Sequence, residues 1–129
     1  MILLDTHILI WLKVEPTKLS AGASDAIRTA RRNDGLAVSA ITLWEVAWIA
    51  THGRLDFVGT VDALLERFSL GISIRPITPK IAVLANQLPP SYPNDPSDRL
   101  IGATAMAEGV ALVTKDRAVR DCKQIKTIW

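Results

Sequence analysis

Met1-Ile2-Leu3-Leu4-Asp5-Thr6-His7 opens the chain, and the expected architecture follows from this stretch. Four consecutive apolar residues that meet Asp5 and Thr6 without a spacer predict a short, fully buried strand that ends at a carboxylate. In open α/β sheets the ligand crevice lies beyond the carboxyl ends of the strands. We therefore expect Asp5 at the functional edge of a sheet.

Beyond this stretch, segments typical of strands alternate with segments typical of helices. Further strands are predicted at 36–38, 72–77, 110–113 and 125–129, and helices at 6–13, 20–32, 39–50, 61–68, 80–88 and 96–108. Strands separated by helices pair in parallel through right-handed crossovers. The prediction is one α/β domain over residues 1–129, a three-layer α/β/α sandwich with a central, mainly parallel sheet of four to five strands. The strand order stays open.

The composition is that of an ordinary globular protein, with 49% apolar and 22% charged residues. Charged residues interrupt every apolar run well before the roughly 20 residues that a membrane span needs, so no membrane segment is expected. No secretory signal is expected either, because a basic leader and a long apolar stretch are missing. A single cysteine, Cys122, excludes an intrachain disulfide and suits a cytoplasmic protein.

The net charge of +2 is too small to identify a nucleic-acid partner by itself. If four of the 13 acidic residues share one pocket, nine acids remain on the surface against 15 basic residues. A positive surface around a negative pocket attracts phosphate, while the pocket can bind phosphate only through a metal ion. A mildly basic protein without a polyanionic partner is an equal alternative on charge alone.

Four acids, Asp5, Glu45, Asp98 and Asp116, stand where predicted strands end or predicted helices begin. Each has a purely structural alternative. Asp5 can cap the following helix, and Asp116 can favour a first turn through the helix dipole. Glu45 and Asp98 each lie three positions after a residue suited to capping, the spacing of a capping box.

Taken together, the four acids favour a metal site, because strand ends and helix starts meet at one edge of a parallel sheet. Neighbouring carboxylates repel by about 1 to 4 kcal/mol per close pair unless a cation separates them. All of the available ligands are oxygen atoms, and no cysteine or histidine set has zinc spacing. We therefore expect Mg²⁺ or Mn²⁺ as the cofactor.

Four blocks of sequence, in this order, resemble the PIN-domain nucleases, and among them the small VapC-type toxins of prokaryotic toxin–antitoxin pairs. The blocks are Leu3-Leu4-Asp5-Thr6-His7, Ser39-Ala40-Ile41-Thr42-Leu43-Trp44-Glu45-Val46-Ala47, Asp95-Pro96-Ser97-Asp98-Arg99-Leu100-Ile101-Gly102-Ala103-Thr104-Ala105 and Leu112-Val113-Thr114-Lys115-Asp116. The resemblance spans the whole chain, and no acid of the pattern is missing.

This resemblance implies a divalent-metal-dependent ribonuclease that hydrolyses RNA phosphodiesters and is the toxin of a VapBC-like pair. It implies Asp5 and Asp98 as the first metal ligands, with Asp116 as a third and Glu45 completing the catalytic set directly or through water. The metal ion would activate a water molecule for in-line attack. The implied partners are RNA and a VapB-like antitoxin that covers the acidic site.

Residues next to the four acids receive weaker assignments. Thr6 and Thr114 either orient water or cap helices, and capping is favoured. Arg99 and Arg117 are candidate contacts for RNA phosphate, although solvated surface arginines are the commoner case.

Trp44 and Trp48 lie four positions apart, so they share one face of a helix and are expected in the core. A helix that is apolar all round must also bury a second face. That face is the candidate surface for a homodimer or for the antitoxin.

Other functions fit the sequence less well. A phosphatase of the haloacid-dehalogenase type needs a second aspartate where this chain has His7, and a receiver domain needs paired acids at its first strand. Neither of the glycine-rich phosphate-binding motifs is present. The alternative that remains is a non-catalytic PIN-like scaffold that binds RNA or protein.

Overall fold

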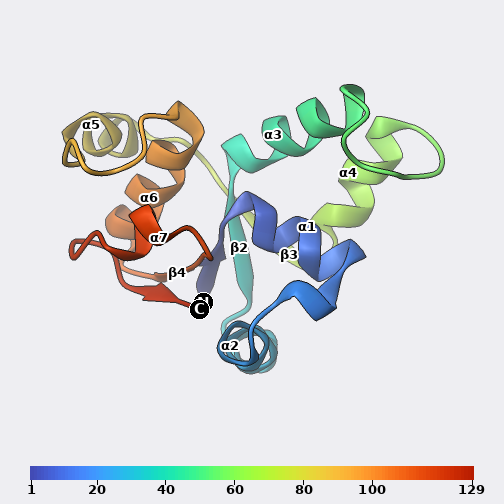
Figure 1. Cartoon of the computed structure of the whole chain (residues 1–129), viewed down its shortest axis with the longest axis horizontal. Coiled ribbons are helices and arrows are strands. Elements are labelled where there is room, and N and C mark those ends of the chain that lie inside the picture. Colours follow the sequence, from blue (N-terminus) through green and yellow to red (C-terminus); the bar gives the residue numbers. More distant parts are fainter.

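The computed structural model describes all 129 residues and contains one sheet of five parallel strands (Figure 1). The strands are β1 (Ile2–Leu4), β2 (Leu36–Ser39), β3 (Ile72–Arg75), β4 (Ala111–Val113) and β5 (Thr127–Ile128). Their order is β3-β2-β1-β4-β5, and every neighbouring pair is parallel. The predicted α/β sandwich is confirmed, and β3 and β5 are the two edge strands.

Seven α-helices and a short 3₁₀ segment connect the strands. They are α1 (Thr6–Val14), η1 (Pro16–Lys18), α2 (Ala21–Arg32), α3 (Ala40–Thr51), α4 (Val61–Ser69), α5 (Pro79–Gln87), α6 (Pro96–Glu108) and α7 (Arg117–Arg120). Each α-helix begins after a side chain that accepts a hydrogen bond from a first-turn amide: Asp5, Ser20, Ser39, Thr60, Thr78, Asp95 and Asp116. Such a cap stabilises a helix by about 1 kcal/mol.

Two predicted strands are shorter than expected. The edge strand β3 ends at Arg75, before Pro76, which has no amide hydrogen to donate to a ladder. The last strand covers only Thr127–Ile128, because β5 pairs with β4 alone, over two residues. The longest ladder nevertheless joins β2 to β3, over four residue pairs, and the next joins β1 to β4, over three.

The strand order places a switch point between β1 and β4. The chain builds β1, β2 and β3 outward in one direction and then crosses through α5 and α6 to begin β4 on the other side of β1. Crossovers leave in opposite directions at such a point, so a crevice opens beyond the carboxyl ends of the two strands. Asp5 follows β1 directly, and Thr114 follows β4 directly.

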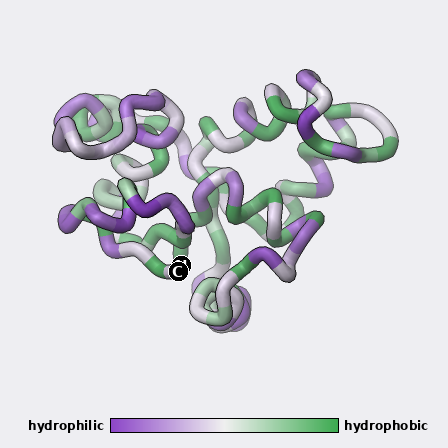
Figure 2. The backbone as a smooth tube through the Cα atoms, viewed as in Figure 1, coloured by the Kyte–Doolittle hydropathy of each residue, from purple (hydrophilic) through white to green (hydrophobic).

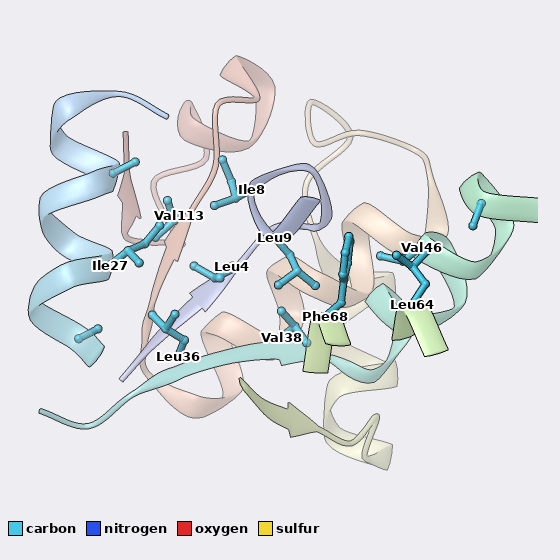
Figure 3. Packing of buried hydrophobic residues seen from close by; sticks show 13 residues of the cluster. Leu4, Ile8, Leu9, Ile27, Leu36, Val38, Val46, Leu64, Phe68 and Val113 are labelled. Carbon is cyan, nitrogen blue, oxygen red and sulfur yellow. The ribbon is translucent and has the colours of Figure 1, made fainter. Parts of the chain in front are cut away.

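Alternate residues of the central strands bury opposite faces of the sheet. Leu4, Val38 and Val113 pack with residues from α1 to α4 in one cluster (Figure 3). Leu3 and Leu112 pack on the other face with residues of α6, α7 and the loop between α5 and α6. This loop, residues 88–95, contains three prolines, and we call it the Pro-rich loop. Complete burial of a leucine contributes roughly 2 kcal/mol, so the two clusters fix the strands between two helical layers.

The hydropathy of the residues follows the same layering in the sheet, whose strands are largely apolar (Figure 2). None of the helices has both the length and the apolar character that crossing a membrane requires.

Candidate active site

Asp5 is fixed at the carboxyl end of β1 by three hydrogen bonds. Its backbone amide donates to the carbonyl of Val113 at 3.0 Å. Its Oδ1 accepts from the amide of Thr6 at 2.9 Å, and its Oδ2 accepts from the hydroxyl of Thr114 at 2.7 Å. Only 5% of Asp5 is exposed. Asp5 therefore caps α1 and also presents a carboxylate of fixed orientation to the crevice.

Thr114 connects the two acids that follow β1 and β4. While its hydroxyl donates to Asp5, the same oxygen accepts the amide of Asp116 at 3.1 Å. Asp116 in turn caps α7, because its Oδ1 accepts the amide of Ala118 at 2.9 Å. The prediction that Thr114 caps a helix is wrong, since Asp116 is the capping residue. Thr114 instead fixes the position of the Asp5 side chain relative to the backbone of Asp116.

Glu45 reaches the same edge from the second turn of α3. Its Oε1 accepts the hydroxyl of Thr6 at 2.6 Å, and that hydroxyl lies 3.0 Å from the hydroxyl of Thr42. A hydroxyl has one proton, so Thr42 must donate to Thr6 while Thr6 donates to Glu45. Burial, more than the neighbouring charge of Asp5, raises the pKa of Glu45.

Two structural alternatives for these residues are wrong. Glu45 does not close a capping box with Thr42, because Ser39 caps α3 and Glu45 bonds to α1. Thr6 does not cap α1, because Asp5 does. The hydroxyl of Thr6 is therefore free to orient Glu45.

Asp98 is the acid without a partner. It lies in the first turn of α6, but its carboxylate accepts no hydrogen bond from the protein, and Asp95 alone caps this helix through the amide of Ser97 at 2.8 Å. Burial, followed by the charges of Asp5, Asp95, Glu45 and Asp116, raises the pKa of Asp98 to about 7. The charges of the other three predicted acids, Asp5, Glu45 and Asp116, therefore all act on the carboxylate of Asp98.

These residues fit a hard divalent cation by their chemistry. Asp98 offers unengaged carboxylate oxygens, and burial, followed by the neighbouring carboxylates, raises its pKa. The structure nevertheless holds no group of three acidic, histidine or cysteine side chains close enough to bind one ion together. The predicted three-carboxylate ligand set of Asp5, Asp98 and Asp116 is therefore not assembled. Mg²⁺ is commonly held by one or two carboxylates and completes its shell with water.

Three residues of the site were not predicted from the sequence. Asp95 adds to the negative field besides capping α6. Thr42 orients Thr6, as described above. His7 accepts the amide of Lys115 at 3.2 Å through Nε2, with its Nδ1 3.8 Å from Oδ2 of Asp5. The only sequence feature that could have identified these three residues is that each lies close to one of the four acids in the chain, and this does not predict their hydrogen-bond partners.

The two arginines predicted to contact phosphate differ. The guanidinium of Arg99 faces four backbone carbonyls, those of Ala85, Leu88, Pro89 and Tyr92, at 3.2 to 3.5 Å. The donors of Arg99 are directed to α5 and to the loop that follows it, which disfavours a contact with RNA phosphate, and its assignment stays a prediction. Arg117 is exposed and engaged in no ion pair or side-chain hydrogen bond, so its assignment stays a prediction.

Trp44 and Trp48 are not in the core as expected, since 59% of Trp44 and 36% of Trp48 are exposed. The buried stripe of α3 is Thr42, Val46 and Ala50, and both tryptophans fall beside it. They line a groove of about 590 Å³ between α3 and the start of α6, together with Glu45 and Asp95. An apolar surface thus adjoins the acidic site.

Comparison with known proteins agrees with this arrangement. The PIN domain family profile matches residues 2–124. Ribonuclease VapC22 of Mycobacterium tuberculosis is 42% identical over 130 residues, which covers 99% of this chain and 98% of that protein.

Several solved structures superimpose on the chain over nearly its whole length. VapBC2 from Rickettsia felis, bound to a DNA fragment from its promoter, superimposes with a TM-score of 0.75 at 19% identity, covering 98% of this chain and 97% of that chain. FitAcB from Neisseria gonorrhoeae gives a TM-score of 0.71 at 19% identity, over 98% and 96%. At such identities the likeness concerns the fold.

Proposed function

The chain belongs to the PIN-domain family, and from this premise we propose that it is a divalent-metal-dependent endoribonuclease and the toxin of a VapBC-like toxin–antitoxin pair. The observation that carries the proposal is Asp98, a carboxylate without a partner among four other acids at the switch point of the sheet. A scaffold that only binds RNA or protein has no use for such repulsion, whereas a nuclease relieves it by binding a cation.

We assign the metal to Asp5 and Asp98, with Asp116 acting through water. When bound, Mg²⁺ or Mn²⁺ supplies positive charge to the scissile phosphate and acidity to a water molecule. Thr114 and Thr6 hold Asp5 and Glu45 in place, so little reorganisation is needed during the reaction. Burial raises the pKa of Glu45 above its ordinary value, which favours a role for this carboxylate in proton transfer.

The test is cleavage of structured RNA by the purified chain in Mg²⁺, with and without EDTA. Asp5→Asn and Asp98→Asn should each lower the rate by at least about a hundredfold, in the range lost on removing one charge-stabilising group. The matched control is Asp25→Asn on α2, which removes an exposed carboxylate paired with Arg28 and should leave the rate unchanged. Cleavage that persists in EDTA and in both active-site variants would reject the nuclease in favour of a scaffold.

The partners we propose are RNA, a VapB-like antitoxin and a second copy of the chain, in the cytoplasm. The groove beside Trp44 supports a protein partner, because an exposed tryptophan next to an active site gains free energy when covered. Light scattering of the purified chain measures the dimer. Co-purification with the product of an adjacent short reading frame, reduced by Trp44→Ser, tests the antitoxin.

A further inference from the structure

A second set of residues outside the acidic crevice has the composition of a nucleic-acid surface. Lys115, Arg117 and Arg120 lie on the turn after β4 and on α7, and all three are exposed. Arg117 and Arg120 line a polar hollow of about 480 Å³ with Asp121, Thr127 and Trp129. The turn before α7 is hydrophilic (Figure 2). We call Trp11, Lys115, Arg117, Arg120 and Trp129 the basic strip.

The basic strip is continuous, and it begins at the acidic site. The rings of His7 and Trp11 are 5.0 Å apart, edge to face, and His7 accepts the amide of Lys115. The ammonium group of Lys115 lies 5.7 Å from the ring of Trp11, whose centre is 6.1 Å from that of Trp129. Asp116, one of the four acids, stands between Lys115 and Arg117 in the chain. The strip therefore runs outward from the candidate site along its β4 side.

No cation of the basic strip forms an ion pair, although the ammonium group of Lys115, like that of Lys18, lies over the ring of Trp11. The ion pairs of the chain involve Arg28, Arg75, Lys18, His7 and the amino terminus, and none involves a cation of the strip. One acid, Asp121, shares the hollow with Arg117 and Arg120. Three unpaired cations beside an indole ring form the combination that binds single-stranded nucleic acid, with cations at phosphates and a base stacked on the ring.

The apolar groove at Trp44 does not offer the same chemistry. Its lining includes the carboxylates of Glu45 and Asp95 and no basic residue, so it repels phosphate. Of the two surfaces that flank the acids, the basic strip is the one complementary to RNA.

We propose that the basic strip binds the RNA strand on one side of the scissile phosphate. Lys115, Arg117 and Arg120 contact successive phosphates, and an unpaired base stacks on Trp11. This inference rests on the proposed ribonuclease function and names how the same site holds its substrate.

The experiment measures binding of a short, unstructured, fluorescein-labelled RNA by anisotropy in EDTA, over a series of salt concentrations. The double variant Arg117→Gln/Arg120→Gln should weaken binding about tenfold and reduce the slope of log affinity against log salt by about 1.4, since single strands give about 0.7 per phosphate contact. The control is Arg31→Gln/Arg32→Gln, with the same loss of charge at the end of α2. The end of α2 leads to the amino end of β2, whereas the acidic site lies beyond the carboxyl ends of the strands.

Trp11→Leu should weaken binding about tenfold with an unchanged salt slope, in the range of one lost base stack. Trp11→Phe, which keeps an aromatic face, should restore most of the affinity. Thermal melting of each variant identifies any that does not fold. The arginines replaced in the two double variants are exposed, so these variants should fold and can test the inference even if Trp11→Leu does not.

Equal effects of the strip variant and the control variant would overturn the inference, and so would an undetectable affinity of the unaltered chain for RNA. Polyglutamate that binds as tightly as RNA, with the same dependence on the arginines and none on Trp11, would instead assign the strip to an acidic protein. The two proposals fail separately. A chain that binds RNA through the strip without cleaving it loses the nuclease function alone, and a chain whose cleavage and binding ignore the strip loses this inference alone.

Discussion

Replacing Thr114 with valine removes the hydroxyl that joins Asp5 to the amide of Asp116 and changes the side-chain volume little. Thr114 is completely buried, and its hydroxyl lies 2.7 Å from Oδ2 of Asp5 and 3.1 Å from the amide nitrogen of Asp116. Valine provides neither a donor nor an acceptor at this position. The variant therefore isolates the polar role of the residue.

The loss in stability follows from these two contacts. A hydrogen bond to a charged group contributes about 1.5 to 3 kcal/mol, and Asp5 is too buried for water to replace the donor freely. The amide of Asp116 is only partly buried, so its loss adds roughly 0.5 to 1 kcal/mol. Thr114→Val should lower the free energy of unfolding by about 2 to 4 kcal/mol.

Urea denaturation in EDTA measures this change, with Thr114→Ser as the matched control. Serine keeps both hydrogen bonds and loses one buried methyl group, so it should cost only about 1 kcal/mol. RNA cleavage by Thr114→Val should also fall by roughly 10- to 100-fold, the usual effect of removing a group that orients a metal ligand. If valine were tolerated as well as serine in both assays, the hydroxyl would not be positioning Asp5, and our reasoning about the site would be refuted.

Three further predictions concern the loop and helix that carry Asp98. Because its pKa of about 7 lies above the ordinary 3.8, the folded chain keeps a proton that the unfolded chain has lost. The free energy of unfolding should therefore fall as pH rises from about 4 to 7, and urea midpoints in EDTA should show Asp98→Asn flattening this decline. Gly102→Ala normally favours a helix by about 1 kcal/mol. Here the new Cβ overlaps the hydroxyl of Tyr92 and lies 2.9 Å from Cδ1 of Ile125, so calorimetry should show a net loss of about 1 to 3 kcal/mol. Arg99→Lys should speed hydrogen exchange at the Tyr92 amide, because the guanidinium of Arg99 donates to carbonyls of the Pro-rich loop, and it should leave RNA affinity unchanged. Weaker RNA binding by this variant would instead support a contact between Arg99 and phosphate.

The sequence predicts the sheet well because its strands are short apolar runs buried on both faces. Such runs have few alternative placements in a small domain. The positions of Asp5 and Asp116 could be predicted for the same reason, since Asp5 follows β1 directly and Asp116 lies three residues after the end of β4. The position of an acid at a strand end can be predicted from the few residues that precede it in the chain.

The failures concern contacts between distant parts of the chain. Glu45 has the spacing of a capping box with Thr42, yet its partner is Thr6, 39 residues away. Arg99 follows Asp98 directly, but successive residues on a helix point about 100° apart, so its guanidinium turns away from the acids. Trp44 lies on a helix that is apolar on nearly all sides, and such a pattern does not reveal which side the sheet covers.

The Pro-rich loop before Asp98 is tied down twice. The hydroxyl of Tyr92 donates to the carbonyl of Asp98 at 2.9 Å, and Arg99 faces carbonyls at both ends of the segment from Leu88 to Tyr92. A loop held in this way keeps the backbone beside Asp98 in one position before any substrate binds. Little conformational entropy should therefore be lost in this segment on binding.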